Sequence, residues 1–162
     1  MPDVARLALI LPLLALAGCQ LKPVYAGGAA SAPATLLADI SIAPIPERAG
    51  FMVRQALEEQ FGRAVANPRH RLEVVLDDQI TAFGVRGDSS AARERRTLRA
   101  RFRLVDAASG VVLVDDTASA DAGIDRVSSN FAVVAAETTA LERLSVDIAR
   151  QISNRMARYA RR

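Results

Sequence analysis

Apolar and polar residues alternate over four stretches of the chain, and this alternation predicts four β-strands. The third stretch shows it most clearly, because every second residue is apolar and the residues between them are arginines. Its two faces are Leu98, Ala100, Phe102 and Leu104 on one side and Arg99, Arg101 and Arg103 on the other. The four predicted strands cover residues 36–45, 71–83, 93–105 and 111–122. Residues 106–110 predict a hairpin turn between the last two strands.

Two other stretches repeat apolar residues every three to four positions, which is the spacing of an amphipathic helix. The first helix is predicted from about Pro46 to Arg63, with Gly62 at its end. The second is predicted from about Ser129 to Arg161, and at 1.5 Å per residue it is roughly 45–50 Å long. Its apolar stripe consists of Phe131, Val134, Thr138, Leu141, Ser145, Ile148, Ile152, Met156 and Tyr159.

The resulting order of elements is β-α-β-β-β-α. A helical crossover makes the first two strands parallel and right-handed, and the hairpins add antiparallel neighbours. Each helix has one apolar stripe, so both helices are expected to cover the same face of the sheet. We therefore predict an α+β fold in which two helices pack on one face of a mixed four-stranded sheet. The other face, with its arginines, is expected to be exposed or to contact a partner.

The first eighteen residues have the pattern of a secretory signal. Arg6 precedes an apolar run over 7–17, and this run is shorter than the roughly 20 residues that a membrane-spanning helix needs. Leu16–Cys19 looks like the lipobox of bacterial lipoproteins, in which the cysteine thiol takes up lipid and the chain is cut before it. We predict a signal peptide over 1–18 and lipidation at Cys19. The alternative is an ordinary buried thiol at the end of a transmembrane anchor.

Cys19 also indicates where the protein is located and how the rest of the chain is organised. Two or three acyl chains, palmitate among them, make a stable membrane anchor. Gln20 stands where aspartate favours retention in the inner membrane, so we expect the outer membrane and its periplasmic face. Residues 19–35, rich in glycine and alanine, predict a lipidated flexible linker, and residues 36–162 predict one folded domain. A chain with one cysteine forms no intramolecular disulfide.

No catalytic or metal-binding pattern is found in the sequence, and no cofactor is predicted. His70 is the single histidine, it has no nucleophile or metal partner at a usable spacing, and we expect it at the surface. The pairs Asp77–Asp78 and Asp115–Asp116 lie in predicted strands, where adjacent side chains point to opposite faces. Neither pair is therefore expected to form one site, and the sequence favours a binding protein over an enzyme.

Arginine dominates the basic residues of a chain with a formal net charge of +3. The cluster over 93–103 has two interpretations: a solvated strand face that discourages edge aggregation, or a basic strip that contacts anionic lipid or an acidic partner. The arginines at the end of the last helix have the same two interpretations, dipole compensation or contact with membrane headgroups. Nucleic acid is a poor candidate for an exported lipoprotein with few aromatic residues.

Several stretches in the same order resemble the LptE family of lipopolysaccharide-assembly lipoproteins, in its alphaproteobacterial form. The order and spacing of the stretches carry this resemblance, since none is diagnostic alone. Many relatives have Gly-Phe-Arg-Pro-Leu-Tyr after the lipidated cysteine, and this chain departs mildly from that pattern. The stretches are Leu16–Cys19 with Lys22–Tyr25, Ile40–Arg48, Arg71–Val74, Arg103–Gly110 and Ser129–Glu137.

The resemblance implies a two-helix, four-stranded domain that sits as a plug inside LptD, the outer-membrane β-barrel that inserts lipopolysaccharide. It also implies help in folding the barrel and binding of lipopolysaccharide through basic residues, since guanidinium groups suit lipid A phosphates. The expected ligands are Arg86, Arg93, Arg95 and Arg96. The alternative is an auxiliary lipoprotein of an ABC-type lipid transport system, which has a similar layout and would contact periplasmic transport components. A small lipoprotein enzyme is a third, less favoured class.

Overall fold

The computed structural model describes residues 30–62, 65–85 and 91–161, so Cys19 and the predicted signal peptide lie outside the described residues. Four strands form one sheet in the order β1-β2-β3-β4, with β1 parallel to β2 and the other neighbours antiparallel. The helices and strands are α2 (Ala32–Ala38), β1 (Ile40–Ile42), α3 (Glu47–Phe61), β2 (His70–Val85), β3 (Ala91–Asp106), β4 (Val112–Asp125) and α4 (Asn130–Tyr159).

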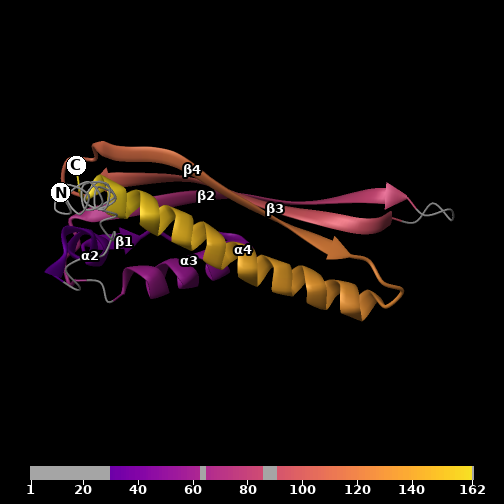
Figure 1. The fold of residues 1–162 in the computed structure, drawn as a ribbon. Helices are drawn as coiled ribbons and strands as arrows, with labels where there is room; N and C mark the ends of the chain where they lie inside the picture. The colour runs from indigo at the N-terminus through magenta and orange to yellow at the C-terminus, as the bar shows by residue number, and fades with distance from the viewer. Residues whose placement is uncertain (1–29, 63–64, 86–90, 162) are drawn as a thin grey trace, which may run out of the picture.

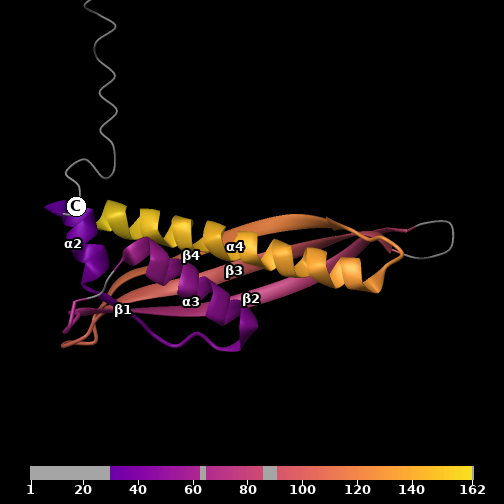
Figure 2. The ribbon, with the colours of Figure 1, turned by 90° about the horizontal axis from the view of Figure 1, so that it is seen from below.

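The predicted mixed four-stranded α+β fold is confirmed. Figures 1 and 2 show α3 and α4 on one face of the sheet, with the other face uncovered. The long hairpin of β2 and β3 and the 30-residue helix α4 make the domain elongated. We call one end of the domain the tip; it is formed by residues 78–85, 91–97 and 121–137. We call the other the α2 end; it is formed by α2, the turn over 107–111 and residues 150–161 of α4.

A third helix, α2, replaces the start of the predicted first strand and the end of the predicted linker. The side chain of Ser31 caps the helix by accepting a hydrogen bond from the Ala34 N–H at 3.3 Å, and Pro33 suits the first turn. Leu37 is buried in the core. The strand prediction over 36–45 was therefore wrong before Ile40, because an alternation of a few residues does not distinguish a strand from a capped single-stripe helix.

The core lies between β3 and α4. The predicted apolar face of β3 is fully buried and packs in the same cluster as the middle of α4. Leu98, Ala100, Phe102 and Leu104 are all inaccessible to solvent, and so are Ile148, Ile152 and Met156. The alternation in the sequence thus predicted the buried face of this strand correctly.

Asp39, at the end of α2, ties the helix to the start of β2. Its carboxylate accepts hydrogen bonds from the backbone N–H of Arg69 at 2.9 Å and from the Arg69 Nε at 2.7 Å. These bonds hold the pKa of Asp39 below its usual range despite its burial, and the bond from the backbone N–H has the largest effect. α2 is therefore held to the sheet by a charged contact as well as by Leu37.

We expect Gly50→Ala in α3 to destabilise the domain by about 1–3 kcal/mol, although alanine usually favours a helix over glycine by about 1 kcal/mol. A Cβ at Gly50 would lie 2.5 Å from the carbonyl oxygen of Ile45, and this atom belongs to the backbone. Urea unfolding measures the difference. Gly123→Ala in β4 is the matched control, because a Cβ there meets nothing within 4 Å. An unchanged or raised stability of Gly50→Ala would contradict this packing.

Candidate binding surface

The uncovered face of the sheet carries arginines of β3 beside carboxylates of β2 and β4. Arg93 Nε lies 3.0 Å from Asp125 Oδ1, and Arg101 Nη2 lies 2.8 Å from Asp115 Oδ2. The hydrogen bonds that Arg101 donates hold the pKa of Asp115 below its usual value. Arg103 and Arg71 both bond to Glu73. The arginine face is exposed, as expected, and neighbouring carboxylates balance most of its charge.

The two pairs of adjacent aspartates divide between the two faces of the sheet, as the strand pattern predicted. Asp77 is exposed and accepts from Gln79, whereas Asp78 faces the helices and bonds to Arg96. Asp115 likewise bonds to Arg101 on the open face, while Asp116 lies 3.2 Å from Arg155 of α4. Neither pair brings its two carboxylates to one site.

The structure divides the four arginines that were predicted as lipopolysaccharide ligands. Arg86 lies outside the described residues. Arg93 and Arg95 project from the open face of the sheet at the tip, and both are exposed. Arg96 points the other way, toward the helices, so it shares no surface with Arg93 and Arg95. The described part of the predicted set is therefore a pair of arginines with a third on the opposite face.

Arg96 is held by a dense set of hydrogen bonds. Its Nε donates to Asp78 Oδ1 at 2.8 Å, its Nη2 donates to the other carboxylate oxygen, and its Nη1 donates to the Glu137 carbonyl at 2.9 Å. The bonds to Asp78 raise the pKa of the guanidinium above its usual value. Arg96 lines a cleft of about 370 Å³ between the sheet and the starts of α3 and α4. Its bonds join β2, β3 and α4, which is a structural role.

Exposed apolar side chains accumulate at the tip. Phe131 is 85% exposed and Val134 is 58% exposed, so their assignment to the buried stripe of the last helix was wrong. Figure 1 shows the reason: α4 extends well beyond α3, and its first turns lack that neighbour. Ile80, Phe83 and Val127 are also exposed, and the Arg95 guanidinium lies 5.6 Å from the centre of the Phe83 ring.

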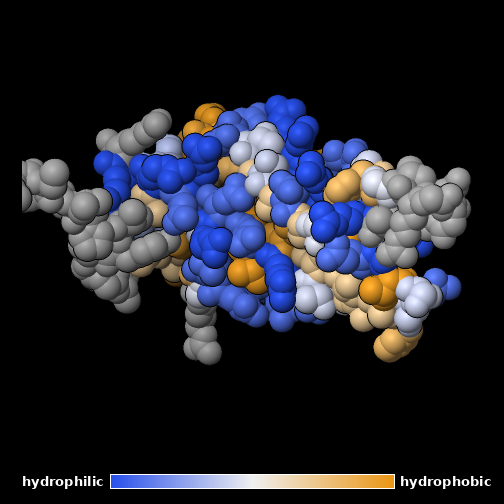
Figure 3. Space-filling view, turned by 45° about the vertical axis from the view of Figure 1, so that its right-hand side comes forward, coloured by the Kyte–Doolittle hydropathy of each residue, from blue (hydrophilic) through white to orange (hydrophobic). Residues whose placement is uncertain are grey.

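The tip therefore presents apolar and arginine side chains together. Figure 3 shows apolar side chains (orange) among hydrophilic ones (blue) at this end of the molecule. Sequence reasoning missed Phe83, although its position was informative. It shares the parity of Val75 and Asp77 on the open face of β2, where a buried aromatic residue is not expected.

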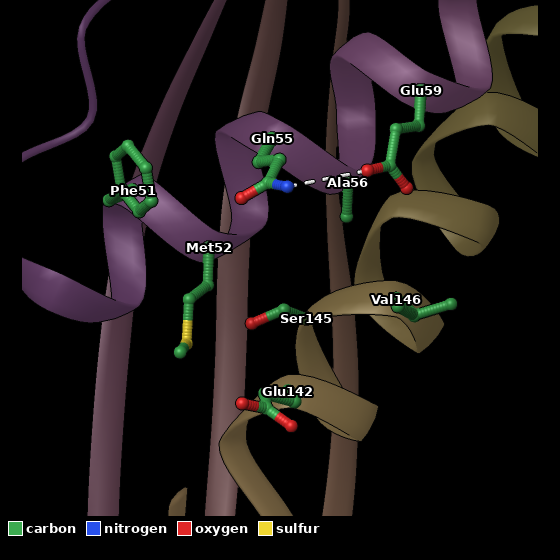
Figure 4. A pocket seen from close by; sticks show the side chains of 8 residues that line it. All are labelled: Phe51, Met52, Gln55, Ala56, Glu59, Glu142, Ser145 and Val146. Carbon is green, nitrogen blue, oxygen red and sulfur yellow. Dashed lines mark hydrogen bonds between the residues drawn. The ribbon is translucent and has the colours of Figure 1, made fainter. Parts of the chain in front are cut away.

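A shallow groove of about 280 Å³ lies between α3 and α4 near their middles. Figure 4 shows the side chains that line it, with Gln55 donating to Glu59 at 3.4 Å on α3. Ser145 of α4 is buried, and its hydroxyl has no hydrogen-bond partner within the part of the chain that the structure describes. Phe51 and Val146 are exposed at its rim. None of the arginines predicted as ligands lines this groove.

His70 is largely buried, with its side chain 14% exposed, so the expectation of a surface histidine was wrong. It opens β2 beside the end of α2, and its Nδ1 lies 3.5 Å from Asp39 Oδ2. Over residues 30–62, 65–85 and 91–161, no three histidine, cysteine or acidic residues are grouped so that they could hold a metal ion. Within the same ranges, no helix is both long and apolar enough to cross a membrane.

The fold recurs in solved structures of bacterial lipoproteins. A candidate lipoprotein from Caulobacter crescentus CB15 superposes with a TM-score of 0.66 at 24% identity, covering 80% of this chain and 95% of that one. Lipoprotein B from Nitrosomonas europaea gives 0.59 at 14% identity, covering 75% and 83%. Rare lipoprotein B from Shewanella oneidensis gives 0.53 at 12% identity, covering 74% and 93%. By its fold, this chain is a two-layer α+β domain of the kind found in these lipoproteins.

The family follows from the sequence. The model of the LptE family, described as lipopolysaccharide-assembly, matches residues 37–156, which is most of the chain. No curated protein matches the sequence significantly. The chain belongs to the LptE family, and this confirms the resemblance that its ordered sequence stretches indicated.

Proposed function

We propose that this protein is a non-enzymatic lipoprotein, anchored through Cys19 on the periplasmic side of the outer membrane, that partners the LptD barrel. In this role it is a plug and assembly factor for the barrel, and it binds lipopolysaccharide during transport to the outer leaflet. The family match over residues 37–156 carries the proposal.

The shape and surface of the domain support this role. An elongated domain with a 30-residue helix suits insertion into a pore-shaped partner. The tip has exposed apolar side chains, Phe131 above all. Groups of exposed apolar side chains commonly mark a surface that contacts another molecule. The ion pairs of the open sheet face suit contact with the polar inner surface of a barrel. Surface ion pairs contribute little to stability, so their side chains can form new pairs with a partner at little cost.

The partner is tested by solubilising membranes gently and purifying the full chain through a C-terminal affinity tag. We expect a large β-barrel protein to co-purify in equal amount. Recovery of periplasmic or inner-membrane transport components, with no barrel, would overturn the plug proposal and favour the auxiliary lipoprotein of an ABC-type system. A pocket-lining variant such as Ser145→Ala is the matched control and is expected to retain the barrel.

For lipopolysaccharide we propose Arg93 and Arg95 as ligands, because both are exposed at the tip beside Phe83. Guanidinium groups bind phosphate in pairs of hydrogen bonds, and the apolar neighbours suit acyl chains. Arg86 stays a predicted ligand outside the described residues. We leave out Arg96, because it faces the helices and is held there by its bonds to Asp78 and the Glu137 carbonyl.

The double variant Arg93→Ala/Arg95→Ala is expected to bind lipopolysaccharide roughly tenfold more weakly, since an exposed charged contact contributes up to about 1 kcal/mol. Binding is measured by titrating labelled lipopolysaccharide in detergent. Arg101→Ala is the matched control, because it removes an exposed, paired arginine from the same strand face further from the tip. Equal losses in the two variants would argue against a site at the tip.

A further inference from the structure

The end of α4 concentrates positive charge. Residues 148–161 contain Arg150, Arg155, Arg158 and Arg161 and no acidic residue. The helix dipole accounts for a cation in the last turn, where Arg158 lies. Arg150 and Arg155 come before that turn, so the dipole does not account for them.

Arg150 and Arg155 have acidic partners. Arg150 bonds to Asp147 at 2.6 Å, and Arg155 lies 3.2 Å from Asp116. Arg158 is exposed and forms no ion pair with any residue that the structure describes. Both acidic contacts are at the surface, where such pairs contribute little and exchange readily with another anion. The guanidinium groups of Arg150, Arg155 and Arg158 are thus accessible to an anionic surface.

The same end of the domain has exposed apolar side chains and a half-buried tyrosine. Val111 ends the turn between β3 and β4 and Val112 begins β4; they are 55% and 45% exposed. A cleft of about 340 Å³ between the start of β4 and the end of α4 is lined by Leu113, Val114, Asp115, Asp116, Arg155, Arg158 and Tyr159. Arginine, tyrosine and small apolar side chains together are typical of surfaces that contact the headgroup layer of a membrane.

The course of the chain brings this end toward the predicted anchor. Figures 1 and 2 both show α2 beside the end of α4, with the turn between β3 and β4 at the same end of the domain. Ala30 is the eleventh residue after Cys19, and this length of chain spans at most about 40 Å when fully extended. The tip lies further away by the length of α4, which is about 45 Å for 30 residues. Lipid on Cys19 would therefore keep the α2 end nearest the membrane.

We propose that the α2 end docks on the phospholipid headgroups of the leaflet that holds the lipid anchor, with Arg150, Arg158 and Arg161 contacting lipid phosphates. Val111 and Val112 enter the interfacial layer beside them. This docking holds the α2 end at the membrane surface and so fixes which end of the elongated domain lies nearest the lipid anchor. The inference rests on the proposed anchoring at Cys19 for its orientation, whereas the headgroup contact itself is a property of the folded domain.

The test uses the mature chain, residues 19–162 with Cys19→Ser, so that binding does not depend on lipid. The protein is floated with vesicles of phosphatidylcholine, with and without phosphatidylglycerol. We expect binding to the vesicles that contain phosphatidylglycerol, weakened by salt. The triple variant Arg150→Gln/Arg158→Gln/Arg161→Gln is expected to bind at least tenfold more weakly, and the corresponding triple lysine variant is expected to retain most of the binding.

The matched control is Arg99→Gln/Arg101→Gln/Arg103→Gln, which removes the same charge from the open sheet face. Equal loss in the two glutamine variants would show attraction by net charge alone and would overturn the proposal. Absence of binding to phosphatidylglycerol vesicles would overturn it as well. Thermal unfolding of each variant establishes that the domain is folded.

Lipopolysaccharide micelles replace the vesicles in a third arm. A loss of binding to these micelles by the α4 variant, with phosphatidylglycerol binding unchanged, would make the α2 end a lipopolysaccharide site and reject the phospholipid assignment. Failure of Cys19 acylation in cells would remove the anchor without changing any of these measurements. The proposed anchoring at Cys19 and the proposed docking of the α2 end are therefore tested independently.

Discussion

Replacing Cys19 with serine is expected to abolish acylation completely. A thiolate is a far stronger nucleophile than a hydroxyl at neutral pH, so serine does not take up the lipid. The lipobox peptidase acts on the lipidated form, and residues 1–18 should then remain attached. Labelling of growing cells with radioactive palmitate, followed by intact-mass measurement, should show an unlabelled protein that is longer by this segment.

The neighbouring variant Gln20→Asn is the control for this experiment, because it changes the next side chain and keeps the thiol. It should be labelled and cut like the unaltered chain. Palmitate on the serine variant would refute Cys19 as the acceptor. Cleavage without any label, in both variants, would instead indicate an ordinary secretory signal and a soluble mature protein.

The consequence for membrane attachment is large. Each buried methylene contributes about 0.8 kcal/mol, and two or more acyl chains make release from the membrane slow. The headgroup contact proposed for the α2 end is weak and salt-dependent by comparison. Anchoring and orientation are thus assigned to different groups, the first to Cys19 and the second to the arginines at the end of α4.

The most regular patterns in the sequence predicted the fold well. In β3, the alternation from Leu98 to Leu104 assigned the buried face correctly, because a strand in the middle of the sheet with one covered face has no other way to place these side chains. The helix α3 begins within a residue of the predicted start, and Gly62, with a φ of 77°, ends it as expected.

The sequence predictions were wrong where tertiary contacts determine the secondary structure or the burial of a residue. The helix α2 depends on the cap from Ser31 and on burial of Leu37, which local alternation does not reveal. Phe131 has helical spacing relative to the core residues, yet α3 does not extend far enough to cover it. No pattern along one helix carries information on where its neighbours end.

The candidate ligands show what strand geometry adds to a grouping by sequence position. Arg93, Arg95 and Arg96 are close in sequence, but strand geometry places the third on the opposite face. The parity that put Leu98 in the core also put Arg96 on the same face, two positions earlier. The alternation of the strand therefore already indicated that Arg96 lies on a different face from Arg93 and Arg95.

We expect Arg96→Ala to lower the free energy of unfolding by about 2–4 kcal/mol. The side chains of Arg96 and Asp78 are 13% and 19% exposed, so the variant leaves a largely desolvated carboxylate without its partner. Loss of one member of a fully buried pair costs about 3–5 kcal/mol, and the residual exposure reduces that cost. The Glu137 carbonyl also loses a donor. Urea unfolding of the mature chain measures the change.

Arg95→Ala is the matched control, because it removes the neighbouring arginine from the exposed face and should change stability by less than about 0.5 kcal/mol. The double variant Arg96→Met/Asp78→Leu should recover much of the loss, since apolar replacement of both partners leaves no unpaired charge. Equal effects of Arg95→Ala and Arg96→Ala would contradict the division of these arginines between two faces. A stable Arg96→Ala with weakened lipopolysaccharide binding would restore Arg96 as a ligand and move the site to the cleft under α4.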